Sequence, residues 1–190
     1  EYNAFMDVTC ITRKKDAVLT SIISQVTPSE SSVIKRVAYE PMFTEHLRDH
    51  LGIKGVIKVS MHEPLTNIRK LIIVICERGM PSTEIWRALY GAASLHRAAG
   101  KYVIAVNDDI DPDNADAVFW AMAYRANPAL DVEILKHRDS GHGPRSDRAG
   151  GEDASVLFDA TLKEDFPPIS LPKKEFMLNA KEIWEELGLP

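Results

Sequence analysis

A short apolar strand that runs into an acidic turn is the feature that most limits how this chain can fold. The stretch from Lys101 to Pro128 reads KYVIAVNDDIDPDNADAVFWAMAYRANP. Residues 102–106 are apolar throughout, as in a strand that is covered on both faces of a sheet. The pattern predicts a strand, a turn and a helix, which together make half of a βαβ unit. The turn would then lie at the carboxyl end of the strand, where open α/β sheets bind ligands.

The turn itself is rich in carboxylates. Its spacing resembles the start of a calcium-binding EF-hand loop, but Asn114 stands where that loop needs glycine and Trp120 where it needs a bidentate carboxylate. We therefore expect a structural role, in which Asp113 or Asn114 caps a helix over residues 115–126. The apolar face of that helix is predicted to hold Ala117, Trp120, Ala121 and Tyr124. The turn carboxylates are Asp108, Asp109, Asp111 and Asp113.

The rest of the chain alternates strand and helix patterns. Thr27-Pro28-Ser29 predicts a helix start, Pro41 a break, Gly52 a helix end, and Ser82 the cap of a second helix that closes at Gly100. Together these elements predict an α/β fold: a layered sheet with flanking helices and mixed or mostly parallel strands, followed by a C-terminal linker and helix. Strands are predicted over residues 4–12, 17–24, 53–60, 71–77, 102–106 and 131–135.

Residues 136–153 and the tail have a different composition. Four glycines, many charges and two histidines predict a long surface loop over 136–153. Two interpretations of His137 and His142 stay open: they are solvated, or they bind a metal together with Asp139. The proline-rich stretch 167–172 predicts a linker before an amphipathic helix over 175–187. That helix carries Phe176, Ala180, Ile183 and Leu187 on one stripe, and it packs either on another domain or subunit or on its own sheet.

Composition excludes several classes of function. The net charge of −5 and the pI near 5.7 argue against nonspecific nucleic-acid binding. The longest apolar run, 71–76, is too short to span a bilayer. Cys10 and Cys76 lie in apolar segments, which predicts buried thiols in a reducing compartment such as the cytoplasm. The chain begins with Glu1, and we interpret it as a piece of a longer polypeptide. No nucleophile elbow, phosphate-binding loop or dinucleotide fingerprint is present.

Three ordered motifs and the closing helix resemble one enzyme family. A lysine before an apolar strand, then NDDID, FWAMAYR and ANP, resembles the C-terminal domain of the UbiD family of reversible decarboxylases. Ile85-Trp86-Arg87 with Tyr90-Gly91, Phe158-Asp159-Ala160-Thr161 and Trp184 fit the same pattern in the same order. The motifs cover about two thirds of the chain.

The resemblance implies the C-terminal domain of a decarboxylase or carboxylase that acts on an aromatic or α,β-unsaturated carboxylic acid. In that family, prenylated FMN, a divalent metal (Mn or Mg) with K, and the catalytic residues belong mainly to an N-terminal domain, so no catalytic or metal-binding residue is expected in this segment. Lys101 matches a lysine that reaches the flavin site in related enzymes. His142 and Arg145 would belong to a loop that gates the substrate.

The resemblance also implies subunit assembly as a homo-oligomer, either a dimer or a hexamer. Residues 1–165 would form the α/β domain, and residues 166–190 would form the linker and assembly helix. The expected partners are the N-terminal domain of the same enzyme, a small carboxylic acid and CO₂, with no nucleic acid and no membrane. Two alternatives stay open: an oligomerisation module without ligand contacts, and a stand-alone nucleotide-binding α/β domain.

Overall fold

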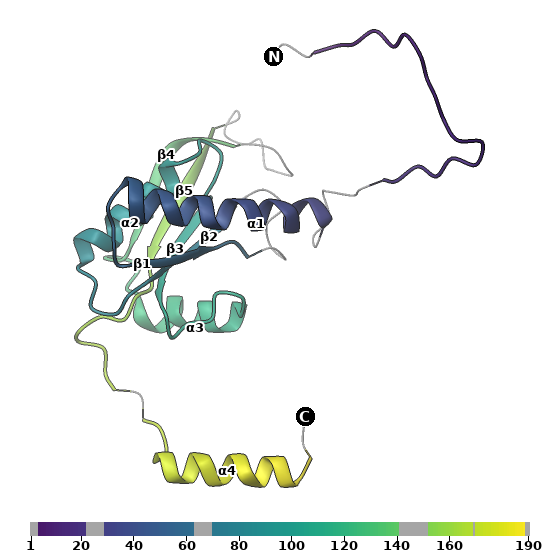
Figure 1. Ribbon diagram of the computed structural model, residues 1–190. Coiled ribbons are helices and arrows are strands. Elements are labelled where there is room, and N and C mark those ends of the chain that lie inside the picture. The colour runs from purple at the N-terminus through teal and green to yellow at the C-terminus, as the bar shows by residue number, and fades with distance from the viewer. Residues whose placement is uncertain (1–3, 22–28, 63–69, 141–151, 169, 189–190) are drawn as a thin grey trace.

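A computed structural model describes residues 4–21, 29–62, 70–140, 152–168 and 170–188. Its centre is a five-stranded sheet in the order β1-β2-β3-β5-β4 (Figure 1). The strands are β1 (Val56–Ser60), β2 (Leu71–Cys76), β3 (Tyr102–Asn107), β4 (Val132–Asp139) and β5 (Glu152–Asp159). The helices are α1 (Glu30–Glu45), which continues as the π-helix η1 (His46–His50), α2 (Ser82–Ser94), α3 (Ala115–Arg125) and α4 (Lys174–Glu186).

The sheet is mixed, with parallel strands at its centre. β3 pairs in parallel with β2 and with β5, whereas β1 and β4 pair antiparallel at the two edges. The α/β fold class predicted from the sequence is confirmed. The strand that follows α3 does not complete a βαβ unit, because β4 runs antiparallel at the edge and the parallel partner of β3 is β5.

Helices cover both faces of the central strands. Along β3, Val103 and Ala105 join a core with α1 and α2, whereas Ile104 and Val106 join a second core with α3 (Figure 1). Successive strand residues point to opposite faces, so a strand buried on both sides needs a continuous apolar run. The predicted strand at residues 102–106 is therefore confirmed for that physical reason.

The predicted break at Pro41 is wrong. Pro41 lies inside α1, which the Ser29 hydroxyl caps by accepting from the Ser32 amide. The helix continues because Phe43 and, in η1, Leu47 are fully buried against the sheet, and this burial outweighs the hydrogen bond that a proline removes. The first half of α1 instead leaves Val33, Ile34 and Val37 exposed. Gly52 ends the helical segment at a φ of 73°, as predicted.

The two predicted strands near the N-terminus are also wrong where the structure describes them. Residues 4–21 form no strand and are exposed along their length, and Cys10 is exposed with them. An alternating pattern becomes a strand only when a neighbouring strand accepts its hydrogen bonds and a core covers one face. Neither lies beside this segment (Figure 1). Cys76 is buried as expected, and burial raises the pKa of its thiol to about 12.

The predicted loop is shorter than residues 136–153. β4 continues through Asp139, and β5 begins at Glu152, which pairs with it. The charged residues at the end of β4 can belong to a strand because β4 is an edge strand of the sheet, where side chains reach solvent. An irregularity between Leu135 and Arg138 places His137 at a φ of 61°. Residues 141–151 lie outside the described part of the chain.

Two of the helices differ from the sequence prediction. Ser82 is the first residue of α2 rather than its cap, and Pro81 occupies the cap position. Every residue of α4 is exposed, and the helix lies apart from the sheet (Figure 1), so packing on its own sheet does not occur. Among the described residues, no helix is long and apolar enough to cross a membrane.

Candidate functional site

Arginines neutralise the acidic turn after β3. Arg125, at the end of α3, donates two hydrogen bonds to the Asp109 carboxylate at 3.0 and 2.5 Å, and Arg78 lies 3.2 Å from the same group. Arg36 reaches Asp113 at 2.6 Å from α1. These contacts join the turn to three other parts of the domain.

The local geometry of the turn is that of a helix start. Asn114 caps α3 by accepting from the amides of Asp116 and Ala117. The hydrogen bonds from Arg125 hold the pKa of Asp109 below its usual range, although burial opposes this shift. No group of three His, Cys, Asp or Glu side chains in the described segments could hold a metal ion. The acidic turn thus begins α3 and joins it through ion pairs to neighbouring elements.

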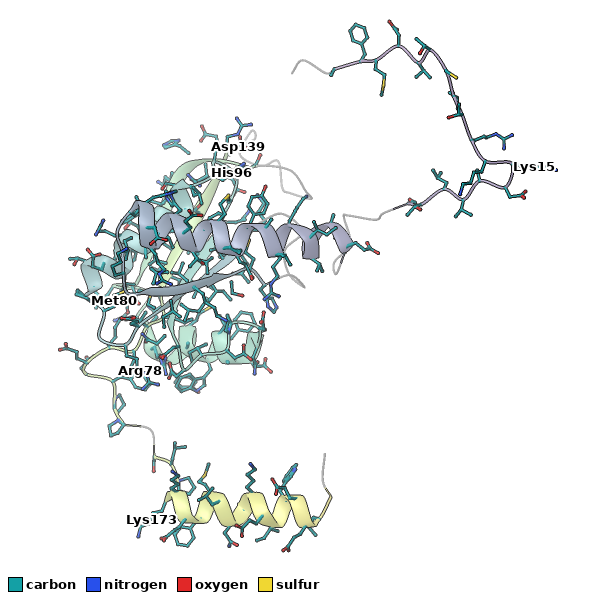
Figure 2. All side chains as sticks on the ribbon, viewed as in Figure 1. Lys15, Arg78, Met80, His96, Asp139 and Lys173 are labelled. Carbon is teal, nitrogen blue, oxygen red and sulfur yellow. The ribbon has the colours of Figure 1, made fainter. Side chains whose placement is uncertain are left out.

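Cations gather at the opposite end of the central strands, where β2, β3 and β5 begin. Figure 2 labels Asp139 and His96 near this end and Arg78 near the other. Lys101 precedes β3, and its ammonium lies 3.0 Å from the Asp153 carboxylate of β5. Burial opposes ionisation of Asp153, but the Ala154 amide and Lys101 hold its pKa below the usual value. Lys101 is thus paired with β5 where the central strand β3 begins, and its side chain stays 40% exposed.

We call this group of charged residues the cationic edge. Arg97 lies 3.2 Å from Asp139, and Lys70 donates to the Ser140 carbonyl at 2.7 Å. Because four cations face two carboxylates, the group has a formal excess of positive charge in a chain whose net charge is −5. The excess attracts anions to this surface, although each of the four cations already has a protein partner. The cationic edge comprises Lys70, Arg97, Lys101, Arg138, Asp139 and Asp153.

Arg138 is a residue that sequence reasoning missed. Its guanidinium donates to the carbonyls of Ala93, His96 (3.4 Å) and Ala99 (3.3 Å), and to the Ser155 hydroxyl at 3.1 Å. A helix leaves its last carbonyls without partners inside the helix, and a cation satisfies them well. Arg138 thus fixes the segment between α2 and Lys101. No sequence signal identified it, because it lay inside a predicted loop.

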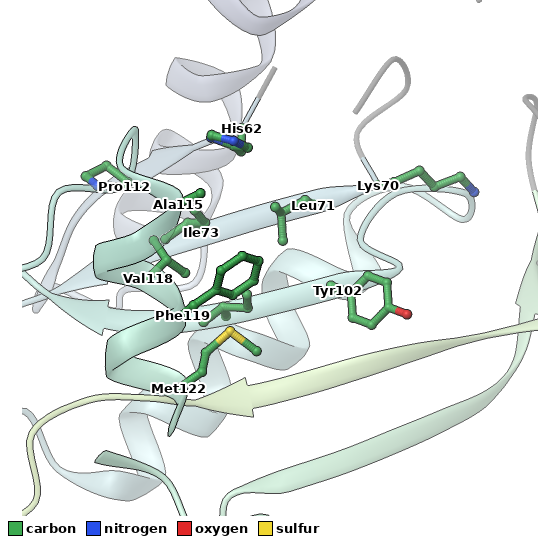
Figure 3. Close-up of a pocket in the computed structure, with 11 residues that line it drawn as sticks. His62, Lys70, Leu71, Ile73, Tyr102, Pro112, Ala115, Val118, Phe119 and Met122 are labelled. Atoms are coloured by element: carbon green, nitrogen blue, oxygen red, sulfur yellow. The ribbon is translucent and has the colours of Figure 1, made fainter. Parts of the chain in front are cut away.

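An apolar cavity opens beside the cationic edge. It has a volume of about 330 Å³ and lies between β2, β3 and α3 (Figure 3). Lys70 lines both this cavity and the cationic edge. We call the cavity the apolar slot. Its walls are formed by His62, Lys70, Leu71, Ile73, Tyr102, Ile104, Pro112, Ala115, Val118, Phe119 and Met122.

The predicted loop histidines do not come together in the described structure. His137 is exposed and lies 3.5 Å from the Glu152 carboxylate, and Asp139 pairs with Arg97. His142 and Arg145 lie outside the described residues. The segment that contains them connects Ser140 to Glu152, so it begins and ends beside the cationic edge.

The chain is similar in sequence to known enzymes. The model of the 3-octaprenyl-4-hydroxybenzoate carboxy-lyase C-terminal domain, UbiD_C, matches residues 32–160. A phenolic acid decarboxylase of Sedimentibacter hydroxybenzoicus is 32% identical over 89 residues, which are 45% of this chain and 18% of that enzyme.

Solved structures share the fold. The UbiD-class enzyme HmfF of Pelotomaculum thermopropionicum, in complex with FMN, has a TM-score of 0.61 and 22% identity over 79% of this chain and 34% of that chain. An evolved dimeric form of HmfF was solved with prFMN. The apo 3,4-dihydroxybenzoic acid decarboxylase of Enterobacter cloacae has a TM-score of 0.65 and 18% identity over 81% and 34% of the two chains.

The chain thus spans about a third of the length of these solved chains, and less of the curated relative. The family match covers more than half of the chain and includes β1 to β3, α2, α3 and the charged turn between β3 and α3. The chain belongs to the UbiD family, as a C-terminal domain of that family.

Proposed function

We propose that this chain is the C-terminal domain of a reversible, non-oxidative decarboxylase or carboxylase acting on an aromatic or α,β-unsaturated carboxylic acid. The observation that carries the proposal is the family match over residues 32–160. The activity named for the curated relative, phenolic acid decarboxylation, agrees with it. The domain assists the reaction rather than performing it, and a reducing compartment such as the cytoplasm suits its buried Cys76 thiol.

The cofactor is prenylated FMN, with a divalent metal (Mn or Mg) and K, held mainly by an N-terminal domain of the same enzyme. Bound prenylated FMN supplies the electrophile that accepts the electrons left as CO₂ departs. On this chain, the cationic edge fits an anionic group of a flavin or a substrate, because Lys101 is held in place by Asp153. Lys101 is the residue we assign to the cofactor.

A charge substitution at Lys101 tests this assignment. In the full-length enzyme, Lys101→Met should weaken the binding of prenylated FMN, measured by flavin absorbance after gel filtration, and Lys101→Arg should retain part of it. Lys58→Met is the matched control, since Lys58 is exposed on the edge strand β1. Equal retention of flavin by Lys101→Met and wild type would remove Lys101 from the site.

The segment between β4 and β5 is proposed to gate the substrate, with His142 and Arg145 near the entrance. Its two ends lie at the cationic edge, and gating changes turnover and apparent affinity together. Replacing Gly141 and Gly143 with alanine should slow turnover, and Arg145→Ala should raise the KM for the acid. Wild-type steady-state kinetics in all three variants would show that the segment is only a connector.

The last part of the chain is proposed to serve assembly. Residues 1–165 form the α/β domain, and residues 166–190 form a linker and an assembly helix, so that the enzyme is a homo-oligomer, either a dimer or a hexamer. α4 exposes Phe176, Ile183 and Trp184, and none of the residues that the structure describes covers them. A helix gains most of its stability from burial of its apolar face, so α4 needs a cover from another subunit or domain.

A further inference from the structure

The apolar slot carries an inference of its own. Leu71 and Ile73 of β2 form its floor with Tyr102 and Ile104 of β3, and one side of α3 forms a wall with Val118, Phe119 and Met122 (Figure 3). The slot exists because α3 has only 11 residues and does not cover the starting ends of β2 and β3. An apolar cavity of about 150 Å³ is large enough to hold benzene, so about 330 Å³ admits a substituted aromatic ring.

The backbone around the slot offers no pairing partner to an extended peptide. β2 is hydrogen-bonded to β1 and β3, and β3 to β2 and β5. The floor therefore has no edge strand that could pair with a peptide, and the α3 backbone is bonded within its own helix. An extended peptide would leave its N–H and C=O groups unsatisfied in an apolar cavity, which is costly. A ligand that needs no backbone partner fits better.

Two polar side chains line one end of an otherwise apolar slot. Lys70 and Tyr102 lie at the end away from α3, and both side chains run outward from the cavity (Figure 3). The Lys70 ammonium donates one hydrogen bond to the Ser140 carbonyl at 2.7 Å, and an ammonium has three donors. Lys70 also belongs to the cationic edge, where cations outnumber carboxylates. A ring in the slot with a carboxylate at this end would place its charge beside an ammonium and a phenol, two groups that donate hydrogen bonds to carboxylates.

We propose that the apolar slot binds a monocyclic aromatic carboxylate, with the ring between Ile104 and Phe119 and the carboxylate toward Lys70 and Tyr102. The inference rests on the proposed function in one respect, namely that the same class of acid is the substrate of the enzyme. All of the described residues that line the slot belong to this domain. The assigned role is a holding site for substrate or product, which can be tested without the flavin and without turnover.

Methionine methyl NMR provides the test, because Met122 is the one methionine that lines the slot among the six in this chain. The full-length protein, purified without flavin and labelled at its methionine methyl groups, is titrated with sodium benzoate. Met122→Leu assigns the Met122 resonance. We expect a saturable shift of that resonance caused by the aromatic ring, with a Kd at least fivefold weaker in Lys70→Met. Sodium acetate, which has no ring, should cause no such shift.

A variant that fills the slot completes the test. Ala115→Phe should abolish the benzoate-dependent shift of Met122, whereas Leu130→Phe, at an exposed position outside the slot, should not. If Ala115→Phe fails to fold by thermal melting, the smaller Ala115→Leu replaces it. Absence of a Met122 shift in the wild type, or an unchanged shift in the filled variant, would overturn the inference. Either result would leave the proposed decarboxylase untouched, because CO₂ release is measured separately.

Discussion

Replacement of Asp109 by asparagine should destabilise the domain strongly. The Arg125 side chain is 2% exposed, and each of its two terminal nitrogens donates a hydrogen bond to the Asp109 carboxylate. Its Cζ lies 5.2 Å from the centroid of the Trp120 ring. Asp109→Asn keeps the shape of the side chain but leaves the buried guanidinium without its countercharge. Removing one partner of a buried ion pair costs about 3 kcal/mol or more.

The size of the effect can be followed by urea unfolding, monitored by circular dichroism at pH 7. In a separate thermal melt, a loss of about 3 kcal/mol should lower the Tm by roughly 6 to 12 °C for a domain of this size. Asp108→Asn is the matched control, because Asp108 and Arg78 form an exposed pair at 3.6 Å. That control should change the free energy of unfolding by no more than about 0.5 kcal/mol.

The same substitution has a defined pH dependence. The folded-state pKa of Asp109 is lowered by Arg125, so its contribution to stability is complete above the unfolded-state pKa, about 3.9, and is lost as the pH falls through the lower folded-state value. The difference between wild type and Asp109→Asn should therefore shrink below about pH 4. Adding Arg125→Met to Asp109→Asn should restore part of the lost stability. A small effect at pH 7, or a difference that stays constant in acid, would refute the reasoning.

Three further substitutions test the fold and the assembly helix. Gly100→Ala should lower the Tm in thermal melts more than Gly52→Ala does. The two glycines have nearly equal positive φ values, 71° and 73°, so both substitutions strain the backbone. Only at residue 100 would the new Cβ also meet a side chain, the Val103 Cγ2 at 2.7 Å. Arg138→Met should cost about 2 kcal/mol in urea unfolding because buried carbonyls lose their donor, whereas Arg97→Met, at an exposed ion pair, should cost little. Deletion of residues 170–190 should lower the oligomer mass measured by light scattering, and an unchanged mass would exclude α4 from assembly.

The central part of the fold could be predicted from the sequence because its signals are local. β3 is apolar at every position from Tyr102 to Val106, and the turn that follows has a cap at Asn114. Such signals do not depend on what lies elsewhere in the chain. The apolar stripe of α3 was predicted less well, since Val118 and Ala121 are buried but Tyr124 is exposed. Periodicity identifies a helix more reliably than it identifies which face is covered.

The remaining differences depend on distant partners. The segment 4–12 has the alternation of a strand, but no strand in the described part of the chain pairs with it. The charged end of β4 becomes a strand because Arg138 and Asp139 pair with β5, which the composition of the segment could not indicate. Lys101 was predicted as a candidate from the resemblance, but its contact with Asp153 arises only when β5 is placed beside β3. The apolar slot likewise has no signal of its own, because its walls come from three separate elements.

Carbon dioxide release tests the central claim most directly. The full-length enzyme and the isolated chain are each supplied with prenylated FMN, Mn²⁺, K⁺ and an aromatic carboxylic acid, and CO₂ is measured over time. We expect cofactor-dependent release by the full-length enzyme and none by the isolated chain, because the proposed function assigns the catalytic residues to the N-terminal domain. Turnover by the isolated chain, or no cofactor-dependent release by the full-length enzyme with any aromatic or α,β-unsaturated acid, would contradict it.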